Sequence, residues 1–481
     1  MSQDLACLDA TGHAELVQRG EAQPKELVDA AIARIERVNP QLNAVIMPLY
    51  DKAMATATNG LPDGLFRGVP FLLKDIFATA EGDPYHMGLR LLRDVRFVAP
   101  FDSYLVAKTK AAGLVCVGRT NVPELGVLPS TESDAYGPAR NPWDPERSTG
   151  GSSGGAAAAV AAGLVPVAHA NDGGGSIRIP ASECGLVGLT PSRGRSSLGP
   201  LMGEALGGFA VEGCVSRTVR DTATFLDVIS GAMPGDPYTA PPPPRPYRVM
   251  AGAMPGRVRI GVMTRTPGGI GAVHPDCVAG AQRAATALAA LGHVVEESHP
   301  AALDELEAGQ HATVVWATYL HHLIDELAPL YVGRRITPDD VDPLNWALAD
   351  MGRAVGVGQY LNALMWLQSH TRRVAQWWAD GFDLLLTPTL PEPPPLLGHF
   401  RPTADDPVAC GMRASAFACF TMPFNVTGQP AISLPLHWTA SGLPVGVQLA
   451  AAYGREDLLI RVASQLEQAQ PWRDRRPRVH A

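Results

Sequence analysis

The chain has 481 residues, 46% of them hydrophobic and 18% charged, with a formal net charge of −8. This composition predicts a folded globular protein with enough length for a large buried core. The acidic balance argues against nucleic acid as a partner, since the most basic stretch is short and lies over residues 473–478.

Signals for targeting and for metal binding are weak. The opening stretch MSQDLACLDATGH contains acids and no apolar core, so it does not resemble a secretory signal. No apolar run reaches the ~18 residues of a membrane span. The seven cysteines include no CxxC pair, and the histidines have no common metal-ligand spacing. We therefore expect a soluble cytoplasmic protein with reduced thiols and no metal site.

The first part of the chain predicts a helix followed by short strands. Residues 25–38 carry one apolar face at helical spacing, and Asn39-Pro40 is expected to end that helix. Apolar runs follow over residues 42–50 and 68–77. The second run is bounded by glycine and proline and is typical of a buried strand.

Helices continue to alternate with strands along the chain. A helix, a glycine and a strand occur in that order twice, with the strands expected over 114–117 and 165–170. The Pro-rich stretch 235–248 could mark a domain boundary, but the strand pattern that follows it favours an extended connector inside one continuous sheet. Further strands are expected over 257–264, 294–298, 382–391, 431–438 and 443–451. This order predicts an α/β layered fold, with a single domain over 1–470 and a C-terminal tail over 471–481.

Lys74 ends the apolar stretch VPFLLK, where a solvated lysine is out of place. Burial favours the neutral amine and lowers a lysine pKa by several units. A neutral lysine is a competent general base near neutral pH. The plain alternative is a lysine that reaches solvent from a strand end and pairs with Asp75.

The stretch GGSSGG, residues 150–155, leads directly into an alanine-rich segment, which argues against a flexible linker. It lacks the lysine and the spacing of a phosphate-binding loop. The pattern G-x-S-x-G occurs twice, around Ser152 and Ser153, but a nucleophile elbow requires a preceding strand, and the residues before it are rich in turn formers.

The stretch NDGGGSIRIPAS, residues 171–182, places three glycines before Ser176. Consecutive glycines allow backbone N–H groups to converge on one point, as an oxyanion hole requires. A serine at the end of such a turn is well placed to attack the carbonyl whose oxygen is held there. The plain alternative is a glycine turn that leads into a strand.

Taken together, these segments supply a base (Lys74), a relay (Ser152) and a nucleophile (Ser176) without a histidine. At this point the sequence resembles the amidase signature family: GGSSGG, whose Ser152 precedes Ser176 of DGGGSIRIPA by 24 residues, is similar to the family's fingerprint, as is GVPFLLKD upstream. NPWDPERSTGGSSGG, CGLVGLTPSRGR and PFNVTGQPAISLP also resemble the family, so the resemblance extends to about residue 470. Within this family, the sequence is most similar to amidases that cleave nylon oligomers, aryl acylamides and carbamates.

The resemblance implies a Ser–cis-Ser–Lys triad, with Ser176 as nucleophile, Ser152 as the bridging serine after a cis peptide bond, and Lys74 as base. It implies oxyanion donors from the backbone N–H groups of Gly173, Gly174, Gly175 and Ser176. Ser153, Asp172 and Arg178 are implied as supports around the triad. The implied fold is a mixed sheet of about eleven strands covered by helices on both faces.

Two positions depart from the family pattern. Gly173 stands where members usually carry threonine, which predicts a more flexible oxyanion site. Val127 replaces a residue that is often polar, which predicts a more apolar acyl side.

The implied reaction is hydrolysis of a neutral amide, of the oligoamide, anilide or carbamate type, through an acyl-enzyme. It requires no metal or organic cofactor. The expected substrate loops are residues 81–98, 199–213, the segment around Trp316 and Tyr319, and 412–424, although their apolar residues could equally pack the core. The alternatives are the amidase subunit of a tRNA-dependent amidotransferase and a non-catalytic scaffold. The sequence leaves open which amide is cleaved and whether the chain forms a homodimer.

Overall fold

The computed structural model describes residues 2–403 and 405–481. At its centre is an 11-stranded mixed sheet in the order β1-β3-β2-β6-β8-β7-β12-β13-β11-β9-β10. Its strands are β1 (Val45–Pro48), β2 (Pro70–Lys74), β3 (Val115–Thr120), β6 (Val167–Asp172), β7 (Val187–Thr190), β8 (Val211–Ser216), β9 (Arg259–Val262), β10 (Val294–Glu297), β11 (Leu384–Pro388), β12 (Ala431–Trp438) and β13 (Pro444–Ala451). A separate hairpin pairs β4 (Glu132–Ser133) with β5 (Gly137–Pro138).

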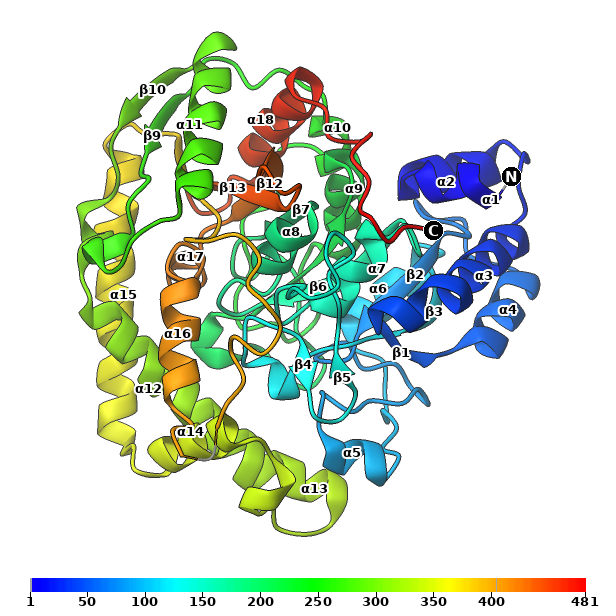
Figure 1. The fold of residues 1–481 in the computed structure, drawn as a ribbon, viewed down its shortest axis with the longest axis horizontal. Helices are drawn as coiled ribbons and strands as arrows, with labels where there is room; N and C mark the ends of the chain where they lie inside the picture. Colours follow the sequence, from blue (N-terminus) through cyan, green and yellow to red (C-terminus); the bar gives the residue numbers. More distant parts are fainter. Residues whose placement is uncertain (1, 404) are drawn as a thin grey trace.

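Helices surround this sheet (Figure 1). They are α1 (Ser2–Cys7), α2 (Ala10–Gln18), α3 (Pro24–Leu42), α4 (Tyr50–Thr58), α5 (Arg90–Asp94), α6 (Tyr104–Ala111), α7 (Gly154–Ala161), α8 (Arg178–Cys184), α9 (Val219–Ile229), α10 (Tyr247–Met250), α11 (Pro275–Ala290), α12 (Glu307–His322), α13 (Ala328–Val332), α14 (Pro343–Arg353), α15 (Val357–Ala379), α16 (Ala409–Phe417), α17 (Met422–Thr427) and α18 (Glu456–Ala469). A π-helical turn, η5 (Leu323–Leu327), extends α12.

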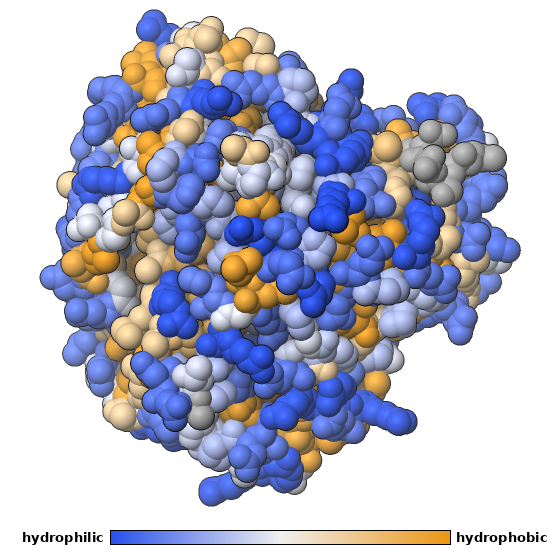
Figure 2. Space-filling view, in the orientation of Figure 1, coloured by the Kyte–Doolittle hydropathy of each residue, from blue (hydrophilic) through white to orange (hydrophobic). Residues whose placement is uncertain are grey.

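Both faces of the sheet are covered by helices, which confirms the predicted fold. Alternate side chains of β2 enter opposite layers: Phe71 and Leu73 belong to the apolar core that includes residues of α9, α11 and α18, whereas Leu72 belongs to the core that includes residues of α3, α7 and α8. All eight residues of α7 are buried, and its alanines let the helix lie close to the strands. The surface in Figure 2 is mainly hydrophilic, with small apolar patches.

The order of the strands brings the predicted site residues together. β2 is parallel to β6, so both strands end at the same edge of the sheet, where Lys74 closes β2 and Asp172 closes β6. β6 is antiparallel to β8, with Asn171 opposite Glu212. The carboxyl ends of parallel strands are where α/β proteins build their sites.

One predicted helix boundary is wrong. Pro40 does not end the first helix, because α3 continues to Leu42 and ends at Asn43, whose φ is +49°. The Asn39 side chain accepts hydrogen bonds from the N–H groups of Ala44 and Val45 and so holds the exit of the helix. Pro40 is tolerated because it lies in the last turn, where one missing backbone bond leaves only the exposed Glu36 carbonyl to water.

Other strand boundaries differ from the prediction by a few residues. The strand expected over 114–117 is β3, which continues to Thr120, and the strand expected over 165–170 is β6, which begins at Val167. The Pro-rich stretch 235–248 precedes β9, which belongs to the same sheet as β2. Beyond residue 470 the chain packs on the body, where Trp472 is buried and its indole N–H donates to the Arg217 carbonyl. No helix of the described residues is long and apolar enough to cross a membrane.

Candidate active site

Lys74 is completely buried at the end of β2. Its Nζ lies 2.7 Å from Ser152 Oγ, 2.5 Å from Asn171 Oδ1 and 3.4 Å from the Asn171 carbonyl oxygen. The alternative of a solvated lysine paired with Asp75 is therefore wrong. The first of these contacts joins the predicted base to the predicted relay.

The surroundings of Lys74 favour its neutral form. Burial lowers the pKa of the amine to about 7, while the carboxylates of Glu212 and Asp172 act in the opposite direction. A lysine with this pKa is present in both forms near neutral pH, so it can accept a proton and later return it.

Ser152 lies in a tight loop in which the preceding residue, Gly151, has no room for a side chain. The Gly151–Ser152 peptide bond is cis. A Cβ on Gly151 would lie 2.5 Å from the Leu128 carbonyl oxygen, so any side chain there would collide with backbone. Ser153 follows as the N-cap of α7, and its hydroxyl donates to the Asn171 carbonyl at 3.3 Å. This packing places Ser152 over Lys74, whereas Ser153 lies against β6.

Ser176 follows the glycine turn that connects β6 to α8, so the alternative of a turn leading into a strand is wrong. Ser176 is half-buried and lines the same cavity as Ser152. Among the described residues, its hydroxyl has no hydrogen-bond partner.

One of the four predicted oxyanion donors is already engaged. The N–H of Gly175 donates to Asp172 Oδ1 at 2.6 Å, and Gly175 takes a φ of +134° to do so. Within the part of the chain that the structure describes, the N–H groups of Gly173, Gly174 and Ser176 have no such partner. The prediction that Gly175 adds a fourth donor is therefore corrected, because Asp172 occupies that N–H.

Asp172 and Arg178 form a fully buried ion pair beneath this turn. The guanidinium reaches the Asp172 carboxylate through Nε and Nη2, at 3.1 Å each, and holds the pKa of Asp172 well below its usual range. Thr190 and Asn425 donate to the same carboxylate at 2.5 and 2.8 Å. The carboxylate is thus permanently charged, and it fixes the glycine turn through Gly175.

Three further residues of the site were missed in the sequence. Asn171 holds Lys74 through Oδ1, and its Nδ2 donates to the Ile76 carbonyl. Thr421 donates to the Gly174 carbonyl at 2.8 Å, and Asn425 joins Asp172 to Arg178. Only Asn171 gave a usable signal, as a polar residue at the end of a buried strand; Thr421 and Asn425 lie about 250 residues further along the chain.

The hydroxyls of Ser152 and Ser176 open into a cavity of about 510 Å³. Three of the four predicted substrate loops line it, through residues of 81–98, of 199–213, and through Trp316 and Tyr319. The segment 412–424 contributes no lining residue among those described. Val127 does not face the cavity either; it packs against core residues such as Leu128 and Leu348, so the expected apolar acyl side has another origin.

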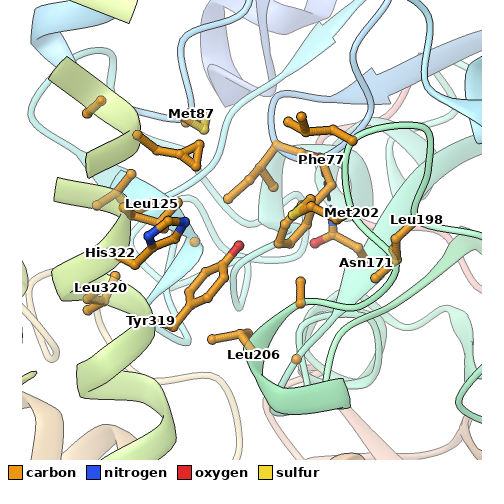
Figure 3. A pocket seen from close by; sticks show the side chains of 18 of the residues that line it. Phe77, Met87, Leu125, Asn171, Leu198, Met202, Leu206, Tyr319, Leu320 and His322 are labelled. Atoms are coloured by element: carbon orange, nitrogen blue, oxygen red, sulfur yellow. Dashed lines mark hydrogen bonds between the residues drawn. The ribbon is translucent and has the colours of Figure 1, made fainter. Parts of the chain in front are cut away.

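The cavity walls are mainly apolar side chains. Phe77, Met87, Leu125, Met202 and Leu206 surround it, as Figure 3 shows. From α12, the phenol of Tyr319 and the imidazole of His322 point into the space between them (Figure 3). Such a cavity suits a largely uncharged organic molecule.

The geometry agrees with the relationships of the chain. The family model described as Amidase matches residues 26–460, and the chain belongs to this amidase family. It is 44% identical over 480 residues to the 6-aminohexanoate-cyclic-dimer hydrolase of Paenarthrobacter ureafaciens, covering 98% of this chain and 96% of that one.

Solved structures give the same result. A 6-aminohexanoate cyclic dimer hydrolase complexed with substrate superposes with a TM-score of 0.96 at 42% identity, covering 99% of this chain and 100% of that one. A bacterial aryl acylamidase of the amidase signature family gives a TM-score of 0.86 at 29% identity, covering 97% and 96%. The chain is therefore an amidohydrolase that cleaves amide C–N bonds.

Proposed function

We propose that the protein hydrolyses neutral, mainly apolar amides of the oligoamide, anilide or carbamate type through an acyl-enzyme on Ser176. Ser152 is the proton relay and Lys74 the base. The observation that carries this proposal is the 2.7 Å contact between Lys74 Nζ and Ser152 Oγ in a fully buried position. No histidine is needed, because the lysine itself takes and returns the proton.

The hydrogen bonds around Lys74 suit a proton carrier. A neutral amine has two N–H donors and one lone pair. Asn171 offers two acceptors, Oδ1 and its carbonyl oxygen, so the lone pair is left for the Ser152 hydroxyl. When Lys74 gains a proton it donates to the same three oxygens, and the Ser152 hydroxyl is then free to receive a proton from Ser176. Neither state requires Lys74, Asn171 or Ser152 to move.

In the first half of the cycle, Ser176 Oγ attacks the carbonyl carbon while its proton passes to Ser152 and that of Ser152 to Lys74. The N–H groups of Gly173, Gly174 and Ser176 stabilise the oxyanion. The relay then returns the proton to the leaving amine as the C–N bond breaks. Water repeats the sequence on the acyl-enzyme and releases the acid.

A feature of the oxyanion turn accounts for glycine at position 173. A Cβ there would lie 2.9 Å from Leu206 Cδ1, closer than the two atoms can approach without movement. A threonine there would therefore require the end of the Leu206 side chain to move. The turn keeps its rigidity through Asp172 and Thr421 rather than through a side chain at 173.

The lining of the cavity supports a substrate with sizeable apolar groups. Its walls belong to two apolar clusters, one around Met87, Leu125 and Ile324, the other around Leu206 and Met202. Phe77 packs against both clusters. A large, mainly apolar cavity favours secondary amides and carbamates over primary amides, which release only ammonia.

Covalent labelling and a substrate panel test the proposal together. A fluorophosphonate is expected to label Ser176 in the wild type, and Ser176→Ala, Ser152→Ala and Lys74→Ala are expected to lose both labelling and hydrolysis. The exposed Ser441→Ala is the matched control and keeps both. The panel contains primary amides, anilides, cyclic oligoamides and carbamates, assayed with the isolated chain. Unchanged hydrolysis by Lys74→Ala, with circular dichroism showing a native fold, contradicts the triad.

A further inference from the structure

The backbone of Lys74, rather than its amine, contacts a second group of buried polar residues. The N–H of Lys74 donates to His169 Nδ1 at 3.2 Å, and His169 Nε2 lies 2.7 Å from Glu212 Oε2. His169 is fully buried and Glu212 is 3% exposed. No sequence motif or proposed reaction step uses either residue.

These contacts fix the protonation of His169. Since Nδ1 accepts from a backbone N–H, it carries no proton, and the proton of the neutral ring must lie on Nε2. His169 therefore donates to Glu212. Within the described residues, this is the one hydrogen-bond donor to the Glu212 carboxylate.

The sheet register keeps the three groups together. Glu212 of β8 lies opposite Asn171 of β6, and His169 is two residues earlier on β6, so its side chain lies on the same face. Asn171 binds the Lys74 amine, and His169 binds the Lys74 backbone. The neighbouring strand β6 thus holds Lys74 at both its amine and its backbone.

Of the carboxylates of Asp75, Asp172 and Glu212 near Lys74, that of Glu212 is the one without a cationic partner among the described residues. Asp172 is paired with Arg178, and Asp75 has the Arg119 guanidinium near it. Glu212 has only the neutral His169. Its carboxylate is the first of the two charges that oppose the effect of burial on Lys74. Without a compensating charge, burial drives a lysine pKa down.

We propose that His169 and Glu212 are positioning residues, which anchor the backbone of Lys74 and keep a negative charge beside its amine. The inference depends on the proposed role of Lys74 as the base. It assigns a purpose to a buried carboxylate whose desolvation is otherwise unexplained. The charge keeps the lysine basic enough to take a proton from the serines, while burial keeps it neutral enough to do so near pH 7.

The test is the pH dependence of fluorophosphonate labelling, which requires no known substrate. Glu212→Gln keeps the shape of the side chain and removes its charge, which lowers the pKa of Lys74. The acidic limb, meaning the part of the pH profile over which the labelling rate falls with decreasing pH, is therefore expected to move down by about one pH unit. The rate at pH 6, relative to the plateau, then rises about fivefold. Glu297→Gln, on the exposed end of β10, changes the net charge equally and is expected to leave the limb in place.

Two further variants address folding. Glu212→Asp retains the charge and is expected to keep the wild-type limb at a lower plateau rate. His169→Leu removes the donor that holds the Glu212 carboxylate in place and the acceptor that anchors the Lys74 backbone, so the limb is again expected to move down. Circular dichroism reports whether each variant is folded.

The outcomes separate the two proposals. If wild-type Ser176 is not labelled at any pH, the proposed function fails. If the wild type is labelled and the limbs of folded Glu212→Gln or His169→Leu coincide with its own within 0.2 unit, the positioning role is overturned. A purely structural role lowers the plateau or the melting temperature in the variants without moving the limb.

Discussion

Asn171 Oδ1 lies 2.5 Å from Lys74 Nζ, so one amide shares the buried lysine with Ser152. An amide is neutral at every working pH. It can therefore orient the amine without stabilising its charged form as strongly as a carboxylate would. The pKa of Lys74 is therefore determined mainly by burial and by more distant charges.

The first prediction concerns that pH. Because burial lowers the pKa of Lys74 to about 7, the neutral base predominates above pH 7 and is lost below it. The rate of Ser176 labelling is expected to rise with pH to a midpoint near 7. Asn171→Asp places a negatively charged carboxylate next to the amine and is expected to move the midpoint upward. Lys74→Arg, which stays charged, is expected to be inactive at every pH. A midpoint that stays in place in folded Asn171→Asp contradicts the assignment.

The second prediction concerns Gly175. A Cβ there would lie 2.3 Å from Thr421 Oγ1 and 2.7 Å from Ile179 Cδ1, at a φ of +134°. Gly175→Ala is expected to lower the free energy of unfolding by more than 2 kcal/mol, roughly the sum of strain and overpacking. Gly231→Ala is the matched control, since its φ is +98° and no atom lies within 4 Å. Urea unfolding of the two variants separates steric conflict from backbone strain; equal losses would argue that Thr421 does not confine the turn.

The third prediction concerns the buried ion pair. Arg178→Met leaves the Asp172 charge without its main partner and is expected to cost about 3–5 kcal/mol of unfolding free energy. The loss should depend on pH, because the pKa of Asp172, which is held low in the folded wild type, rises in the variant. The variant is then expected to lose less stability in acid than at pH 7, relative to the wild type. Urea unfolding at pH 5 and pH 7.5 checks this. Surface Arg473→Met, whose side chain is 82% exposed, serves as control.

The sequence was informative where local chemistry decides the structure. A lysine at the end of an apolar strand and glycines around two serines indicated a base and a relay, and the resemblance to the amidase signature family implied that Lys74 and Ser152 belong to one triad. The engagement of Gly175 by Asp172 could not be foreseen, since it depends on how both carboxylate oxygens divide among Gly175, Ile177 and Arg178.

Contacts between distant segments were also beyond the sequence. Thr421 and Asn425 reach the oxyanion turn because β12, which follows α17, pairs with β7 beside β8. That order of strands is a property of the whole sheet and leaves no trace in local periodicity. The limited effect of Pro40 has a similar origin, because it depends on Asn39 making hydrogen bonds beyond the helix end.

The fourth prediction concerns Gly173 and Leu206. Gly173→Thr restores the residue usual in the family, yet its Cβ would meet Leu206 Cδ1 at 2.9 Å. The single variant is therefore expected to lose about tenfold in kcat/KM, as Leu206 is pushed into the cavity or the turn is displaced. Leu206→Ala removes the obstacle, so in the double variant Gly173→Thr is expected to cost little beyond the effect of Leu206→Ala alone. A double-mutant cycle with a coupling energy of about 1 kcal/mol or more supports this contact; additive losses contradict it.

The fifth prediction concerns Tyr319, whose hydroxyl points into a mainly apolar cavity (Figure 3). Within the described residues it has no hydrogen-bond partner, and burial raises its pKa, so it stays a neutral donor. We expect Tyr319→Phe to raise KM severalfold for substrates with a second carbonyl, such as cyclic oligoamides, with little change in kcat. Simple anilides, which have no second carbonyl, should show no change in KM. Tyr331→Phe, also on the cavity wall but with its ring tilted against Phe97, is the matched control. An equal rise in KM for both substrate types would mean that Tyr319 acts by shape rather than by its hydroxyl.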